Sequence, residues 1–116
     1  MEVNCFWDGP RLTLLEQMCL ASFLHHGIGV NLYAYDPPHD VPAGVVLRDA
    51  TDILPRDRLF RYAAGSFNVG SVAGFAIIFR YELLLKHGGW WTDTDVCCLQ
   101  SWDLENAEIY FREAYF

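Results

Sequence analysis

Two aspartates one residue apart, Asp93 and Asp95, have the types and spacing that point most directly to chemistry. They follow the glycine pair Gly88-Gly89 and the aromatic pair Trp90-Trp91. Carboxylate oxygens are hard ligands that suit Mg²⁺ or Mn²⁺. Residues i and i+2 of a strand share a face, so both carboxylates could bind one ion that holds a diphosphate. The alternative interpretation of Asp-Thr-Asp is a polar turn after a strand.

Arg80 is a further candidate, because it lies in a segment that is apolar nearly all round. We expect residues 72–87 to form a buried helix that leads directly to the acidic pair. An arginine in so apolar a helix needs an anionic partner. Two kinds of partner remain open: Asp49 or Asp52 in an internal salt bridge, or the phosphate or sugar of a ligand.

Composition excludes some classes of function. Eight basic and fifteen acidic residues give the chain a net charge of -7, and no cluster of Lys or Arg is present, which argues against nucleic-acid binding. No signal peptide opens the sequence and no apolar run reaches the roughly 18 residues of a membrane span, so we expect a cytoplasmic location. The four cysteines lack CxxC spacing and are predicted to be free core thiols in a reducing compartment. They are Cys5, Cys19, Cys97 and Cys98.

Strand-like and helix-like segments alternate along the chain, which predicts an α/β fold with a βαβ crossover. A capping box at Thr13 and Glu16 predicts the start of the first helix, which should stop at Gly27. Residues 56–74 are expected to form an active-site loop or a poorly ordered connector. Strands are predicted at residues 3–7, 29–36, 45–50, 90–92, 96–100 and 108–112, with a single helical turn at 51–55.

The stretch from Phe79 to Asp95 resembles the signature of DXD-containing sugar transferases. This group is related to mannosyltransferases, capsular polysaccharide transferases and the glucosyltransferase domains of large clostridial toxins. The similarity covers nearly the whole chain, from Phe6-Trp7 onward. It implies that residues 1–116 are the donor-binding part of a GT-A-type domain, with a Rossmann-like, mainly parallel sheet and flanking helices. The implied activity is transfer of a hexose to a glycan or protein acceptor.

The resemblance also assigns six residues to the donor site. Asp95 would bind the metal directly, Asp93 would lie in the ribose, sugar and ion region, and Arg80 would contact the donor sugar or diphosphate. Trp7 would stack on the nucleotide base, although a buried core tryptophan explains this residue equally well. Tyr81 and Trp91 would shape the site. The implied cofactor is Mn²⁺ or Mg²⁺, which assists departure of the nucleoside diphosphate, and a UDP-sugar is favoured over a GDP-sugar.

One departure from the family pattern concerns the sugar. The family has a Ser-Asp pair shortly before the arginine, where this chain has Ala76-Ile77. A carboxylate that would hold sugar hydroxyls is thus replaced by an aliphatic side chain. Two alternatives therefore remain beside the transferase: a nucleotide-sugar-binding module without turnover, and an α/β interaction protein.

The hydrophobic content of 53% is high for so short a chain. At 116 residues the chain is also shorter than a full nucleotide-sugar transferase, and the family's C-terminal part has no counterpart in it. We expect an incomplete domain whose apolar surface is covered by a further segment, a second subunit or a membrane, and which self-associates when that surface is exposed.

Overall fold

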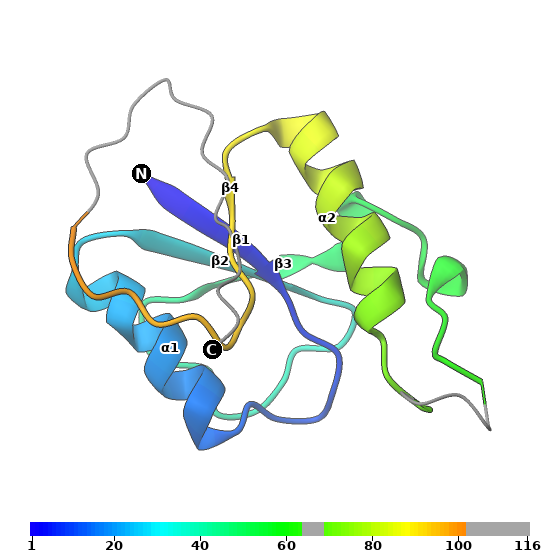
Figure 1. The fold of residues 1–116 in the computed structure, drawn as a ribbon, viewed down its shortest axis with the longest axis horizontal. Coiled ribbons are helices and arrows are strands. Elements are labelled where there is room, and N and C mark those ends of the chain that lie inside the picture. Colours follow the sequence, from blue (N-terminus) through cyan, green and yellow to red (C-terminus); the bar gives the residue numbers. More distant parts are fainter. Residues whose placement is uncertain (64–68, 102–116) are drawn as a thin grey trace, which may run out of the picture.

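Four short parallel strands form the centre of the fold (Figure 1). The computed structural model describes residues 1–63 and 69–101. Strand order is β3-β2-β1-β4, and every neighbouring pair is parallel. The strands are β1 (Glu2–Phe6), β2 (Gly29–Ala34), β3 (Val46–Asp49) and β4 (Trp90–Trp91). The α-helices are α1 (Leu14–His25) and α2 (Ala73–His87), and two 3₁₀ turns are η1 (Ala50–Asp52) and η2 (Arg56–Arg58).

Helix α1 covers one face of the sheet. Alternate residues of β1 point to opposite faces, so Val3 and Cys5 lie on the α1 side. They pack with Leu20 and Phe23 of α1, both of which are fully buried. Burial of such side chains stabilises the fold by roughly 1.5–3 kcal/mol for each large apolar residue.

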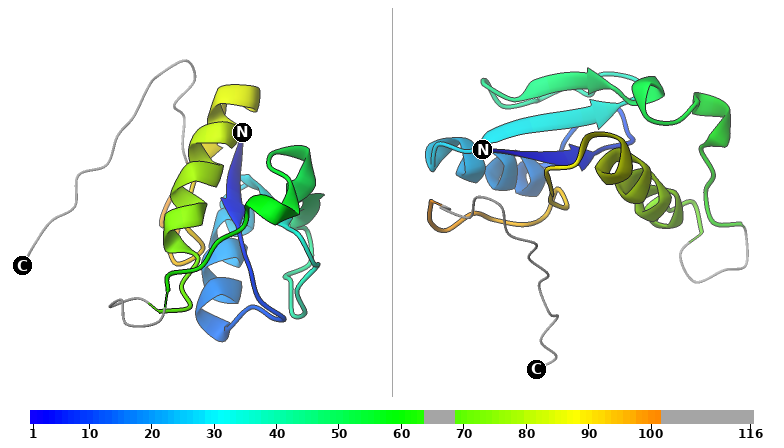
Figure 2. Two further views of the ribbon diagram at one scale, coloured as in Figure 1. Left: turned by 90° about the vertical axis from the view of Figure 1, so that its right-hand side faces the viewer. Right: turned by 90° about the horizontal axis from the view of Figure 1, so that it is seen from above.

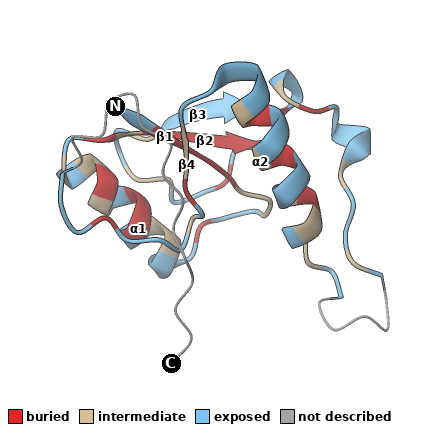
Figure 3. Ribbon diagram, turned by 45° about the horizontal axis from the view of Figure 1, so that its top comes forward, coloured by how far each residue is buried: buried red, intermediate tan, exposed pale blue. Residues whose placement is uncertain are grey.

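Helix α2 covers the other face over the carboxyl halves of the strands (Figure 2). Phe75, Phe79 and Leu83 of α2 are buried, and Phe79 packs on Phe6 of β1 with ring centroids 4.7 Å apart. The prediction of a buried helix is wrong, because within the described residues only the stripe of α2 toward the sheet is covered (Figure 3). Its outward apolar side chains are exposed: Ile77, Ile78, Tyr81 and Leu85.

A row of polar side chains crosses the amino half of the α2 face. Arg48 Nε of β3 donates to Asn31 Oδ1 of β2 at 3.2 Å, and Asn31 Nδ2 donates to Asn4 Oδ1 of β1 at 3.2 Å. Asn4 Nδ2 in turn donates to the carbonyl of Trp90 in β4 at 3.0 Å. Both asparagines are buried, so these bonds satisfy groups that would otherwise be costly to desolvate. We call Arg48, Asn31, Asn4 and the Trp90 carbonyl the polar row.

The α/β class with a parallel sheet is confirmed, and the predicted strands 3–7, 29–36, 45–50 and 90–92 are present with ends shifted by one or two residues. The capping box differs in detail, because the Thr13 hydroxyl donates to the Glu16 carboxylate and accepts no bond from a backbone amide of the helix. The strand predicted at 96–100 is wrong. Its Cys98 amide donates to Ser22 Oγ of α1 at 2.7 Å and not to a neighbouring strand. The strand predicted at 108–112 lies outside the described residues.

The described residues contain no helix that is both long and apolar enough to cross a bilayer. Of the segment predicted as an active-site loop or connector, residues 56–58 form η2, and Tyr62 is bonded to Gly70 and Ser71 through the backbone. The predicted turn at 51–55 corresponds to η1, which Asp49 caps by accepting the Thr51 amide at 2.9 Å.

Replacing the central amide of the polar row should destabilise the fold. Asn31→Ala leaves Asn4 Oδ1 without its donor and Arg48 Nε without its acceptor, so we expect the free energy of unfolding to fall by about 1–3 kcal/mol. Urea denaturation measures this loss. Gln100→Ala, at an exposed position outside the row, is the control and should stay within about 0.5 kcal/mol of the parent. Equal losses for the two variants would contradict the role given to the row.

Candidate functional site

The direction in which successive strands are added to the sheet reverses at β1. This switch point, at the carboxyl ends of β1 and β4, is the candidate site. The chain runs outward from β1 through β2 to β3 and then returns to the opposite side of β1 as β4. In open parallel sheets, ligands bind beyond the carboxyl ends of the strands at such a switch point. Here Trp7 and Asp8 follow β1, and the segment Thr92–Asp95 follows β4. The Thr92 amide donates to the Asn4 carbonyl at 2.9 Å, so the acidic segment begins beside β1.

The acidic segment is a turn rather than a strand. β4 ends at Trp91, and the Val96 amide donates to the Asp93 carbonyl at 3.4 Å, which puts Thr94 and Asp95 at the corner. The strand alternation used to place both carboxylates on one face therefore does not apply. Asp93 Oδ1 accepts the Trp91 indole N–H at 3.1 Å, and both Asp93 and Asp95 are exposed. Of the alternatives open from the sequence, the polar turn describes the backbone, and its two carboxylates remain open to an ion.

Each carboxylate of the acidic turn contributes to the raised pKa of one thiol. Burial raises the pKa of Cys5 to about 12, and the charge of Asp93 contributes to the same increase. Burial also raises the pKa of Cys19 in α1, with smaller contributions from Cys97 and Asp95. Asp93 thus lies near β1, and Asp95 lies toward the first half of α1.

The residues present suit a hard cation that the protein holds through few ligands, rather than one that the protein coordinates completely. Within residues 1–63 and 69–101, no group of three or more His, Cys, Asp or Glu side chains is placed to hold a metal. Asp93 and Asp95 could supply two oxygen ligands. Mg²⁺ commonly keeps several waters and takes its other ligands from phosphate oxygens. The donor set is therefore compatible with an ion that arrives together with a diphosphate.

Trp7 lies at the carboxyl end of β1 and is half-buried against the α1-side core. Its indole Nε1 is buried and has no hydrogen-bond partner among the described residues. Gly9 allows the chain to turn closely around the ring: its φ is +152°, and a Cβ at this position would lie 3.2 Å from Nε1. A buried donor without a partner is uncommon in native proteins. Trp7 thus contributes to the core and also carries an unused donor beside the switch point.

Arg80 and its neighbours lie on α2. The Arg80 guanidinium carbon is 5.2 Å from the ring centroid of Tyr81, and Tyr81 is exposed. The internal salt bridge considered for Arg80 does not form within the described chain, where Asp49 accepts bonds from Thr51. Arg80 therefore has a cation–π contact and no carboxylate partner among these residues. Trp91 packs on Phe79 and contacts Asp93, so the structure brings Trp91 and Asp93 together directly.

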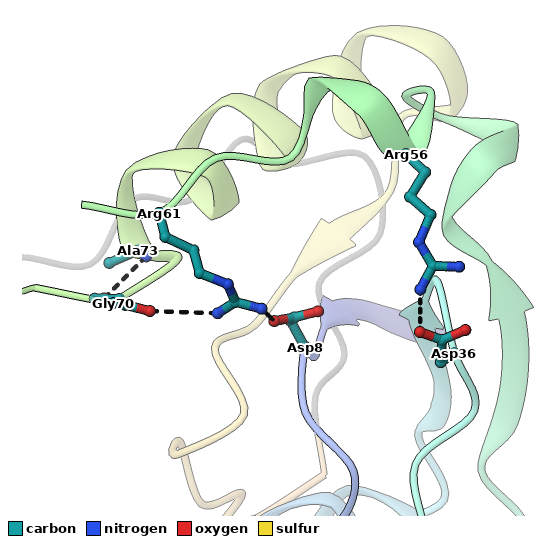
Figure 4. Close-up of polar contacts among 7 residues, drawn as sticks. Asp8, Asp36, Arg56, Arg61, Gly70 and Ala73 are labelled. Atoms are coloured by element: carbon teal, nitrogen blue, oxygen red, sulfur yellow. Dashed lines mark hydrogen bonds and ion pairs between the residues drawn. The ribbon is translucent and has the colours of Figure 1, made fainter. Parts of the chain in front are cut away.

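Sequence reasoning missed two ion pairs at the same edge of the sheet (Figure 4). Arg61 contacts Asp8 after β1, and Arg56 contacts Asp36 after β2. The partners are 53 and 20 residues apart, and nothing in the local pattern links them. The only feature of the sequence that could have drawn attention to these pairs is the position of Asp8 directly after Trp7.

A half-open hollow of about 630 Å³ is lined by residues of β1, β2 and β3, by Asp52 of η1 and by residues 86–89. The polar row forms part of its wall, together with Lys86 and the glycines that end α2. Asp93 and Asp95 do not line it. Because neither Trp7 nor the acidic turn lines it, the hollow is separate from the candidate site.

No family model, curated protein or solved structure matches the chain. Function is therefore inferred from the residues at the switch point and from the sequence resemblance to DXD-containing sugar transferases.

The four cysteines are free, as predicted, but Cys97 is exposed and is not a core thiol. The next residue in the sequence, Cys98, is buried against α1. Burial keeps the Cys5 thiol protonated, since its pKa is about 12.

A thiol-specific reagent should therefore label the native protein at one position. At pH 8 we expect Cys97 to react, whereas Cys5, Cys19 and Cys98 react only after unfolding, because the thiolate is the reactive form and these side chains are buried. Mass spectrometry of labelled native and denatured protein identifies the sites. Cys97→Ser should abolish native labelling, and labelling of Cys5 in the folded state would contradict the placement of β1.

Proposed function

We propose that the chain is the donor-binding part of a GT-A-type glycosyltransferase. It binds a nucleoside-diphosphate sugar through Mn²⁺ or Mg²⁺ and supports hexosyl transfer to a glycan or protein acceptor. The observation that carries this proposal is that Trp7 directly follows β1 and that Asp93-Thr94-Asp95 begins two residues after the end of β4, the adjacent parallel strand. These are the residues that the resemblance assigns to the donor, and the sheet brings them to its switch point.

The chemistry of the two groups is complementary for a nucleotide. The half-buried Trp7 ring offers an aromatic face to a base. Asp93 and Asp95 repel a diphosphate by themselves, so they favour a ligand that comes with a divalent ion. When bound, that ion neutralises charge on the departing diphosphate. Trp91 orients the Asp93 carboxylate by donating to Oδ1, which leaves its other oxygen for the ligand.

Binding without turnover is the second candidate, and Ile77 favours it. Ile77 lies one helical turn before Arg80 and is 47% exposed, so its side chain is not required in the core. An isoleucine cannot accept hydrogen bonds from sugar hydroxyls. A site that holds the nucleotide but grips the sugar poorly would bind donors without positioning the reacting carbon.

Calorimetry with UDP and with GDP, each with Mn²⁺ or with EDTA, tests the proposed function. We expect binding that depends on Mn²⁺ and is tighter for UDP. Asp95→Asn should weaken it by about tenfold or more, because it removes charge from the ion, which corresponds to roughly 1.4 kcal/mol. Thr94→Ala, in the same turn, is the matched control and should change the affinity little. Equal affinity with EDTA would refute metal-dependent binding.

Ile77→Asp should increase affinity for the donor sugar or the rate of its hydrolysis. The new carboxylate would accept hydrogen bonds from sugar hydroxyls one turn from Arg80, and hydrogen bonds to charged groups contribute about 1.5–3 kcal/mol. The exposed position makes the change tolerable to the fold. Comparing UDP-sugars with UDP isolates the sugar contribution. Ile78→Asp, at an equally exposed position of α2, is the control. If the two variants behave alike, residue 77 does not face the sugar.

A further inference from the structure

Two arginine–aspartate pairs reach the carboxyl edge of the sheet from one segment, and they differ in their distance from the switch point (Figure 4). Arg61 contacts Asp8, which follows β1 and is next to Trp7. Arg56 contacts Asp36, which follows β2 on the side away from β4. The two pairs share the same charged groups but differ in position relative to β1 and β4 and in burial, because Asp36 is exposed and Asp8 is largely covered.

The backbone around Arg61 is held in place. The Tyr62 amide donates to the Ser71 carbonyl, and the Gly70 amide donates to the Tyr62 carbonyl, both at 3.0 Å. The side chain of Asp8 is only 17% exposed, whereas that of Arg61 is 51% exposed. Asp8 is thus a largely covered anchor, and the guanidinium that it holds still faces solvent.

One arm of the Arg61 guanidinium is weakly engaged. Nη2 contacts the Asp8 carboxylate, while Nη1 donates to the Gly70 carbonyl at 3.3 Å, beyond the usual 2.7–3.2 Å range. A charge-assisted bond to a phosphate oxygen is about twice as strong as a bond to a neutral carbonyl. Nη1 can therefore exchange Gly70 for a phosphate while Nη2 stays on Asp8.

The proposed donor site also needs positive charge beyond an ion. The chain carries a net charge of -7, and Asp8 follows β1 while Asp93 and Asp95 follow β4. Arg80 lies against the Tyr81 ring. Arg61 is held by Asp8, the residue that follows Trp7 at the carboxyl end of β1.

We propose that Arg61 binds the diphosphate of the donor, and that Asp8 is a positioning residue that orients its guanidinium. This inference rests on the proposed function. It adds a ligand contact that is made by a segment outside the DXD-like signature, more than ten residues before Arg80.

Calorimetry with UDP and Mn²⁺ on matched variants tests the proposal. Arg61→Gln should weaken UDP binding by about tenfold or more, the effect of losing a hydrogen bond to a charged group. Arg56→Gln removes the neighbouring pair and should change binding less than about twofold, a small difference on the same scale. Affinity for uridine, which lacks phosphates, should be the same for both variants and the parent.

Two further variants keep the proposal testable if Arg61→Gln does not fold, as judged by circular dichroism. Arg61→Lys retains the charge but loses the fork that can hold Asp8 and a phosphate together, and it should also weaken UDP binding. Asp8→Asn should weaken UDP binding and leave uridine binding unchanged. Equal UDP affinities for the Arg61 and Arg56 variants would overturn the inference while leaving the proposed function intact. Absence of UDP binding by the parent would instead refute the proposed function.

Discussion

The polar row from Arg48 through Asn31 and Asn4 to the Trp90 carbonyl is the interaction on which the strand arrangement depends. It links all four strands, and each bond is between 3.0 and 3.2 Å long. A register slip of one residue would turn the asparagines toward the apolar α1 side and leave their amides unsatisfied. The row therefore opposes alternative pairings that hydrophobic burial alone would tolerate.

The row also determines where the candidate site begins. β4 has two residues and cannot be held by many ladder bonds. Asn4 compensates, because its side chain holds the Trp90 carbonyl and its own carbonyl accepts the Thr92 amide. Gly89 favours this arrangement because its φ of +85° is a conformation that residues with a Cβ rarely adopt. A residue on the α2 face of β1 thus fixes the start of the acidic turn.

The local sequence pattern was sufficient to predict the elements that are determined by their own residues. β1, β2 and both helices follow from apolar periodicity, from Thr13 as an N-cap and from glycine at the helix ends. The acidic pair and Trp7 could be identified as candidates from the sequence. The geometry of the acidic pair could not be predicted, because β4 ends at Trp91 and the aspartates lie in a turn. The pattern of residues 96–100 indicated a strand, whereas the Cys98 amide has a partner in Ser22, 76 residues away. Arg61 and Asp8 are likewise joined only by the tertiary fold.

The pairing of β1 with β4 has a consequence for the order in which the protein folds. β1, α1, β2 and β3 lie within the first 49 residues and can associate early, since short loops close at a smaller entropic cost. The bond from Asn4 to Trp90 closes a loop across 86 positions, so it forms only after nearly all described residues have been synthesised. Until then one edge of β1 has no neighbour, and an unpaired edge is a template for association with other chains. The nascent chain is therefore most vulnerable to aggregation in the interval before Trp90 and Trp91 leave the ribosome, and the site is among the last parts of the molecule to assemble.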